Sequence, residues 1–223
     1  YYIFRNFTVE FLFKGIDAIF SGYEDISCID EKAKCYVWFY TPPYKWEEEK
    51  VVTEIENYEK MLEWVVSRTD KMILAFTMQR VFCVDFQVEN RRVEQAIKNY
   101  NDKLWELSAM YSHLRIIDIS DFYTGYSVRD LIDWKYYFIS QMPLKPQIAK
   151  DFVCWFRRQV EIVELKRKKC IILDLDNTLW GGILGEDGAD NIKIGEDYPG
   201  NAYRFFQQYL LELSRFGILL TVC

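Results

Sequence analysis

The sequence has a single histidine, His113, and its six cysteines include no Cys-x-x-Cys pair. The chain therefore lacks the ligand clusters of zinc sites and the spacing of a disulfide framework. We predict reduced thiols that pack in the interior, with Cys35, Cys83 and Cys170 in or beside apolar strands and Cys154 on the apolar face of a helix. His113 is predicted to be structural.

Long hydrophobic runs are also absent. No apolar segment approaches the roughly 18 residues that a membrane-spanning helix needs, and no signal-peptide pattern is visible. Positive charge is not in excess, because the chain has 28 Lys and Arg residues and 34 Asp and Glu residues. The resulting net charge of −6 argues against nucleic acid as a partner. We expect a cytoplasmic protein with a sizeable core, and the sequence leaves its oligomeric state open.

The segment that says most about chemistry is 170–182, an apolar run that ends in Asp174 and Asp176. Side chains alternate along a strand, so both carboxylates are predicted to leave the strand end on one side. Such a pair can hold Mg²⁺ and still supply a nucleophile and a proton donor. The alternative is a surface turn, but Asn177, Thr178 and two glycines follow instead of a tight hairpin. The pattern favours phosphoryl transfer.

Asp174-x-Asp176-x-Thr178 after a hydrophobic strand resembles motif I of the haloacid dehalogenase-like (HAD) superfamily. The resemblance implies that Asp174 is phosphorylated, that Asp176 protonates the leaving group, and that the two carboxylates serve Mg²⁺. It also makes Thr178 a candidate substrate-binding residue. The expected fold of this part is the beginning of a HAD Rossmann-like domain.

The stretch 173–188, together with 192–195, resembles more narrowly the FkbH-like subgroup of that superfamily. In that subgroup a phosphatase-type domain makes glyceryl thioesters on acyl carrier proteins from a bisphosphoglycerate, and relatives belong to surface-polysaccharide pathways. The resemblance implies a carrier protein, or a small phosphorylated or acyl-phosphate compound, as partner. It does not indicate which acyl group is handled.

The family resemblance also implies that the second domain is incomplete. A helical pattern with apolar Phe205, Phe206, Tyr209, Leu210 and Leu213 is followed by a predicted strand over 218–223. In the family a Ser or Thr of motif II, a Lys and further acidic ligands come next, and none of them is present. We therefore expect a fragment of a larger enzyme.

Residues 1–145 alternate short apolar segments with amphipathic ones, which predicts a three-layer αβα domain with a parallel sheet, of the flavodoxin- or SGNH-like type. Helices are predicted over 47–68 and 89–111, with apolar stripes that face the core. Strands are predicted over 2–7, 17–22, 35–40, 72–77 and 115–119.

This arrangement is similar to the SGNH-hydrolase-like domain that precedes the phosphatase domain in FkbH-like proteins. An active SGNH esterase has Gly-Asp-Ser after its first strand and Asp-x-x-His near its end. This chain instead has Arg5-Asn6-Phe7-Thr8 and Asp133-Trp134-Lys135-Tyr136. The domain is therefore predicted to be catalytically inactive.

Without a histidine to take its proton, Thr8 is a poor nucleophile and is predicted to cap a helix. The domain would instead recognise substrate or carrier, and Arg5, Asn6 and Thr8 are its candidate substrate-binding residues. Further candidates near the strand ends are Tyr40, Gln79 and Arg80.

Pro143 and Pro146 disfavour a continuous helix and predict a linker over 141–146. A helix over 147–167 is predicted to follow. The predicted organisation is an SGNH-like domain over 1–145, a connecting helix over 146–168, and the first part of a HAD domain over 169–223. The alternative to an enzyme is a non-catalytic module that docks a carrier protein or another partner.

If the second domain is incomplete, this 223-residue polypeptide should show no phosphatase turnover by itself. Release of phosphate from an acyl phosphate, with and without Mg²⁺, measures this directly. Hydrolysis that depends on Mg²⁺ and exceeds the rate of the heat-denatured polypeptide would contradict the expectation.

Overall fold

A computed structural model describes residues 1–28, 30–45, 47–81, 91–164, 169–215 and 217–222. The chain forms two compact units, Tyr1–Val163 and Glu164–Cys223. Cys83, Cys223 and the predicted end of the connecting helix at 165–168 lie outside the described residues. Within the described part, no helix is long and apolar enough to cross a membrane.

The first unit is built on a five-stranded sheet in the order β2-β1-β3-β4-β5, in which every neighbouring pair is parallel. The predicted fold class is confirmed, and a strand forms in each predicted segment. The bounds are Tyr2–Arg5 for β1, Ile19–Tyr23 for β2, Tyr36–Phe39 for β3, Ile73–Phe76 for β4 and Leu114–Ile117 for β5.

Both faces of this sheet are covered, which explains why its central strands are apolar at every position. All four residues of β3 and all four of β4 are buried. Alternation divides the side chains between two cores: Phe4 and Trp38 belong to one cluster, and Ile3 and Phe39 to the other.

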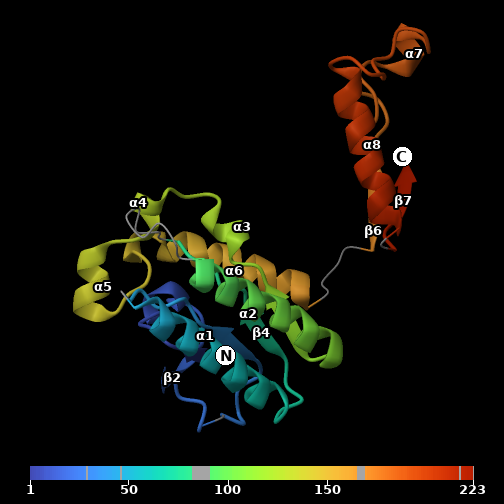
Figure 1. Ribbon diagram of the computed structural model, residues 1–223. Coiled ribbons are helices and arrows are strands. Elements are labelled where there is room, and N and C mark those ends of the chain that lie inside the picture. The colour runs from blue at the N-terminus through green and yellow to red at the C-terminus, as the bar shows by residue number, and fades with distance from the viewer. Residues whose placement is uncertain (29, 46, 82–90, 165–168, 216, 223) are drawn as a thin grey trace. The chain divides into compact units, whose positions relative to one another are not determined.

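The first core lies under two long helices, α1 (Glu48–Val66) and α2 (Arg91–Met110), which pack against each other (Figure 1). Their apolar stripes face the core as predicted, with Ile55 and Leu104 each 1% exposed. A buried bond ties the layers together, because Trp38 Nε1 donates to Tyr100 Oη at 2.8 Å.

The second core lies under α6 (Ala149–Val163), which is the helix predicted after the prolines. Phe152 is fully buried, and its ring lies 5.3 Å from that of Phe13 and 5.4 Å from that of Phe122. Short elements complete this layer and the connections: η1 (Glu10–Phe13), α3 (Ser120–Tyr123), α4 (Val128–Leu131), α5 (Trp134–Ser140) and η2 (Pro146–Ile148).

The second unit holds β6 (Cys170–Leu173) and β7 (Leu219–Val222), which pair in parallel, and the helices α7 (Leu184–Asp187) and α8 (Gly200–Arg215). The strand, helix and strand predicted here are present. On α8, Leu210 is buried, but Phe205 is 73% exposed. The two-stranded sheet β6-β7 offers too little surface to cover α8 on more than one side.

The prediction of buried thiols is wrong for two of the cysteines. Cys35 is buried, but Cys154 and Cys170 are exposed, as is Cys28. Cys170 begins a strand of the small sheet, where little packs over it. Cys154 lies on the side of α6 that faces away from the Phe152 cluster.

Replacement of Phe152 by Ala should lower the free energy of unfolding by about 3–5 kcal/mol, because it removes a ring at the centre of the second core. Urea unfolding followed by circular dichroism measures the loss. The matched control is Phe138→Ala, since Phe138 is 77% exposed and its loss should cost about 0.5 kcal/mol. Equal effects of the two substitutions would contradict the assignment of α6 to this core.

Candidate active site

Asp174 is the first residue after β6 and is exposed. Its Oδ1 atom accepts a hydrogen bond from the backbone N–H of Leu175 at 2.8 Å. Its second oxygen accepts no hydrogen bond and forms no ion pair with any residue that the structure describes. One oxygen of this carboxylate is therefore available to a ligand at the end of the strand.

Asp176 is half-buried, and its surroundings differ from those of Asp174. Its Oδ1 atom accepts two hydrogen bonds, from Trp180 Nε1 at 3.1 Å and from the backbone N–H of Leu184 at 3.0 Å. Within the described residues its Oδ2 atom accepts none. Asp176 is thus anchored through one oxygen, whereas among the described residues Asp174 is bonded only by the backbone of its neighbour Leu175.

The turn after Asp176 is closed by Asn177. The backbone N–H of Asn177 donates to the Gly182 carbonyl at 3.2 Å, and the Gly182 N–H donates to Asn177 Oδ1 at 2.9 Å. Asn177 has a φ of +55°, in the left-handed region that asparagine tolerates well. The carbonyl of Leu175 accepts from Thr178 and Leu179 inside the turn.

Helix α8 supports the turn from one side. Gln207 Nε2 donates to the Leu179 carbonyl at 2.7 Å. Gly181 is buried against α8, because a Cβ atom there would lie 2.9 Å from Cε2 of Tyr203. Gly181 also exchanges two backbone hydrogen bonds with Lys193, so the turn is fixed on both sides.

Asp187 closes the next turn of the chain. Its Oδ2 atom accepts from the backbone N–H of Ile183 at 2.8 Å, at the start of α7. Gly182 has a φ of +103°, and a Cβ atom there would lie 2.8 Å from the same Asp187 oxygen. Only glycine fits this position without strain.

Thr178, the predicted substrate-binding residue of this segment, lies in the turn and is half-buried. Its backbone N–H is bonded within the turn, and its hydroxyl makes no hydrogen bond to any described residue. The structure therefore brings Asp174, Asp176 and Thr178 into one compact segment. A substrate role for Thr178 stays a prediction.

The other predicted substrate-binding residues lie in the first unit, with Arg5 at the end of β1 and Asn6 and Thr8 in the loop that follows. Asn6 is buried and tied to the end of β3, because its Nδ2 donates to the Thr41 carbonyl at 2.7 Å and its Oδ1 accepts from the Thr41 N–H at 3.1 Å. Arg5 pairs with Glu10 at 2.5 Å and lies 4.5 Å from the centre of the Tyr23 ring. Both side chains are held by neighbours of the same unit.

Thr8 does not cap a helix, contrary to the sequence-based prediction. The 3₁₀ helix η1 begins at Glu10, its N-cap residue is Val9, and no side chain caps it. Thr8 Oγ1 is instead 2.7 Å from Tyr23 Oη, in β2. Asp133, which begins the segment compared with Asp-x-x-His, caps α5 by accepting from the N–H of Lys135.

Three buried polar atoms near the carboxyl ends of β3 and β4 have no hydrogen-bond partner among the described residues: Tyr40 Oη, Thr41 Oγ1 and Gln79 Oε1. Burial raises the pKa of Tyr40 far above its usual value, so this phenol stays protonated. Tyr40 and Gln79 were predicted as binding candidates. Their unused hydrogen-bonding capacity is compatible with that role.

His113 has the predicted structural surroundings. Its Nε2 atom is 3.1 Å from the carbonyl of Val66, at the end of α1, and its ring lies 5.7 Å from that of Tyr111. The carbonyl can only accept, so Nε2 carries the proton of this bond.

Sequence reasoning assigned no role to Trp180, the Leu184 amide or Asp187, which organise the loop. Trp180 lies within the stretch 173–188 that resembles the subgroup. The sequence does not indicate which carboxylate accepts a hydrogen bond from its indole N–H, and the folded turn shows that it is Asp176. For Asp187 the sequence does contain a signal: it follows Ile183 by four residues, a spacing at which a side chain can accept a hydrogen bond from a backbone N–H one turn earlier.

No group of three or more His, Cys, Asp and Glu side chains suited to a metal ion occurs among the described residues. The chemistry of the aspartate pair nevertheless fits Mg²⁺, which is commonly bound by one or two carboxylates, with water and substrate phosphate completing its coordination. Asp174 and Asp176 each have one carboxylate oxygen without a hydrogen bond from the described part of the chain.

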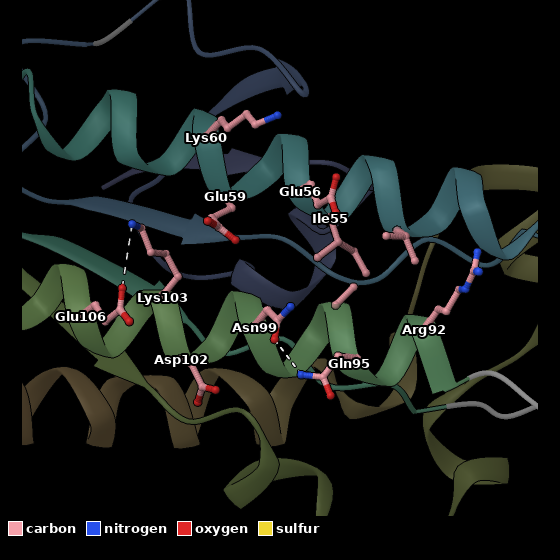
Figure 2. A pocket seen from close by; sticks show the side chains of 12 residues that line it. Ile55, Glu56, Glu59, Lys60, Arg92, Gln95, Asn99, Asp102, Lys103 and Glu106 are labelled. Atoms are coloured by element: carbon pink, nitrogen blue, oxygen red, sulfur yellow. Dashed lines mark hydrogen bonds and ion pairs between the residues drawn. The ribbon is translucent and has the colours of Figure 1, made fainter.

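An open groove of about 810 Å³ lies elsewhere, between α1 and α2 (Figure 2). Its lining mixes carboxylates with cations, and Lys103 Nζ lies 3.9 Å from Glu106 Oε2. Partial burial raises the pKa of Glu59 in this groove. None of the predicted catalytic or substrate-binding residues lines it.

No protein-family model and no curated protein matches this sequence. Among solved structures, the chain matches the crystal structure of the N-terminal part of the protein BF1531 from Bacteroides fragilis, which contains a phosphatase domain and is complexed with Mg. The TM-score is 0.75 at 17% sequence identity, over 100% of this chain and 67% of that chain. The two chains share a fold. At this identity the likeness establishes the fold alone.

Replacement of Gly182 by Ala should loosen the loop, because the new Cβ atom meets Asp187 and the positive φ becomes strained by about 1–3 kcal/mol. We expect the amide of Ile183 to exchange its hydrogen at least about tenfold faster, measured by NMR. The matched control is Gly185→Ala, since no atom lies within 4 Å of a Cβ at Gly185. Equal exchange in the two variants would show that this contact does not hold the loop.

Proposed function

We propose that this chain belongs to a phosphatase-type enzyme that transfers a phosphoryl group through Asp174 with the help of Mg²⁺. The observation that carries the proposal is the contrast between the two carboxylates. Asp174 is exposed at a strand end with one oxygen that no described residue binds, and Asp176, two residues away, is anchored through Oδ1. An uncommitted carboxylate beside an oriented one suits a nucleophile and a proton donor.

In the proposed reaction an oxygen of Asp174 attacks the phosphorus of a phosphate ester, and the bond from phosphorus to the leaving oxygen breaks. Asp176 gives its proton to that leaving oxygen. A water molecule then attacks the phosphorus of the aspartyl phosphate and passes a proton to Asp176. This second step releases phosphate and restores both carboxyl groups.

Asp174 would hold the Mg²⁺ ion through its carboxylate. Asp176, which the motif predicts as a second ligand, accepts two hydrogen bonds at Oδ1, and while its Oδ2 atom carries the proton its side chain has no oxygen to offer the ion. When bound, the ion would neutralise charge on the phosphoryl oxygens, which otherwise repel an attacking carboxylate. Support comes from the donor chemistry of the pair and from the likeness to BF1531, whose N-terminal part was crystallised with Mg.

The finer proposal concerns the substrate. The resemblance of 173–188 to the FkbH-like subgroup supports transfer of a glyceryl group to an acyl carrier protein, or action on another small phosphorylated or acyl-phosphate compound. The first unit, as an inactive SGNH-like domain, would recognise the substrate or the carrier. Asn6 and Thr8 occupy the loop where an esterase would have its nucleophile, and both are bonded to neighbouring side chains or backbone.

A non-catalytic docking module is the alternative. The three buried polar atoms near the ends of β3 and β4 that have no partner in the described part of the chain favour some binding role for the first unit. This role is compatible with catalysis in the second unit. The two proposals separate at Asp174, because a docking module has no use for a nucleophile there.

The test is substitution of Asp174 by Asn in the full-length protein. Incubation with ³²P-labelled acetyl phosphate and Mg²⁺, followed by acid quenching, should label the natural protein and leave Asp174→Asn at background, because an amide is a far weaker nucleophile than a carboxylate. The control is Asp190→Asn, an exposed aspartate of the same unit, which should label normally. Unchanged labelling of Asp174→Asn would remove Asp174 as the nucleophile.

A further inference from the structure

The two hydrogen bonds to Asp176 come from different places in the loop but reach the same oxygen. Trp180 follows Asp176 by four residues and Leu184 by eight, and both donate to Oδ1. A carboxylate oxygen offers about two lone-pair sites, so Oδ1 has little capacity left for a further donor. Substrate must then meet Asp176 through Oδ2.

This arrangement restricts rotation of the carboxylate. The terminal torsion of an aspartate side chain is soft and roughly two-fold, so an unanchored group exchanges its two oxygens readily. Hydrogen bonds that involve a charged group are stronger than neutral ones. Two such bonds to one oxygen therefore keep the other oxygen pointed away from the loop.

The indole that provides one of these bonds is itself held by the fold. Trp180 is half-buried, its backbone forms an isolated parallel bridge with Asp176, and its neighbour Gly181 is fixed by Lys193 and by the ring of Tyr203. Leu179, on its other side, is bound through its carbonyl to Gln207 of α8. The indole N–H is thus in place before any substrate binds.

We propose that Trp180 is a positioning residue, which holds Asp176 so that its Oδ2 atom delivers the proton to the leaving oxygen of the substrate. The inference rests on the proposed phosphoryl transfer. It adds a substrate class: phosphate esters of alcohols, in which the departing alkoxide needs a proton as the bond from phosphorus to oxygen breaks. A leaving group that is already stable as an anion gains little from this arrangement.

The dependence on leaving group provides the test. In the full-length protein with Mg²⁺, Trp180→Phe should lower kcat for an alkyl phosphate by about tenfold or more, the factor expected for loss of one hydrogen bond to a charged group. The kcat for 2,4-dinitrophenyl phosphate should change less than about twofold, and KM for both substrates should change little. Loss of general stability would lower both rates together.

A second replacement removes only the N–H. Incorporation of 3-benzothienylalanine at position 180 keeps the shape of the ring and exchanges the N–H for sulfur, and it should give the same selective loss for the alkyl phosphate. The matched control is Trp105→Phe, because Trp105 is 58% exposed on α2 and should leave both rates unchanged.

A measurement without metal or substrate checks the bond itself. The indole N–H resonance of Trp180, identified by its absence in Trp180→Phe, should move upfield and exchange faster with water in Asp176→Ala. An unchanged resonance, or equal losses for the two phosphate esters, would overturn the positioning role. If Asp174→Asn keeps full labelling, the proposed function itself is contradicted. If labelling depends on Asp174 but Trp180→Phe lowers kcat for the two esters equally, only the positioning role of Trp180 is contradicted.

Discussion

Every pair of named strands in the described parts of the chain is parallel, and parallel pairing requires each connection to cross from one end of the sheet to the other. The loops that follow the strands therefore collect at the carboxyl edge. In the first unit this edge holds Asn6, which follows β1, and Thr41, which follows β3. The side chain of Asn6 forms hydrogen bonds with the backbone of Thr41. In the second unit it holds Asp174. Open parallel sheets bind their ligands at this edge.

The polar side chains at the two carboxyl edges differ in how many of their hydrogen-bonding atoms are used. In the first unit the side chains of Arg5, Asn6 and Thr8 are bonded to neighbours, which suits recognition better than catalysis. In the second unit, α8 and the turn after Asp176 leave one oxygen of each aspartate without a partner among the described residues. Rigid support beneath an uncommitted polar group is what preorganised catalysis requires.

Periodicity was enough to predict the α/β fold and the strands of both units, because these depend on local pattern, whereas the roles of the aspartate pair stay a prediction. What the sequence could not predict depends on partners distant along the chain. Thr8 bonds to Tyr23, fifteen residues away, instead of capping a helix. The exposure of Phe205 and Cys170 depends on how much surface covers a two-stranded sheet, and no local pattern reports that.

The central claim is that Asp174 carries the phosphoryl group, and chemical trapping tests it most directly. Brief reaction of the full-length protein with acetyl phosphate and Mg²⁺, followed by borohydride, reduces an aspartyl phosphate to homoserine at the modified position. Peptide mass spectrometry then identifies that position. The account predicts homoserine at 174 and aspartate at 176. Homoserine at 176, or at neither position while phosphate is released, would contradict it.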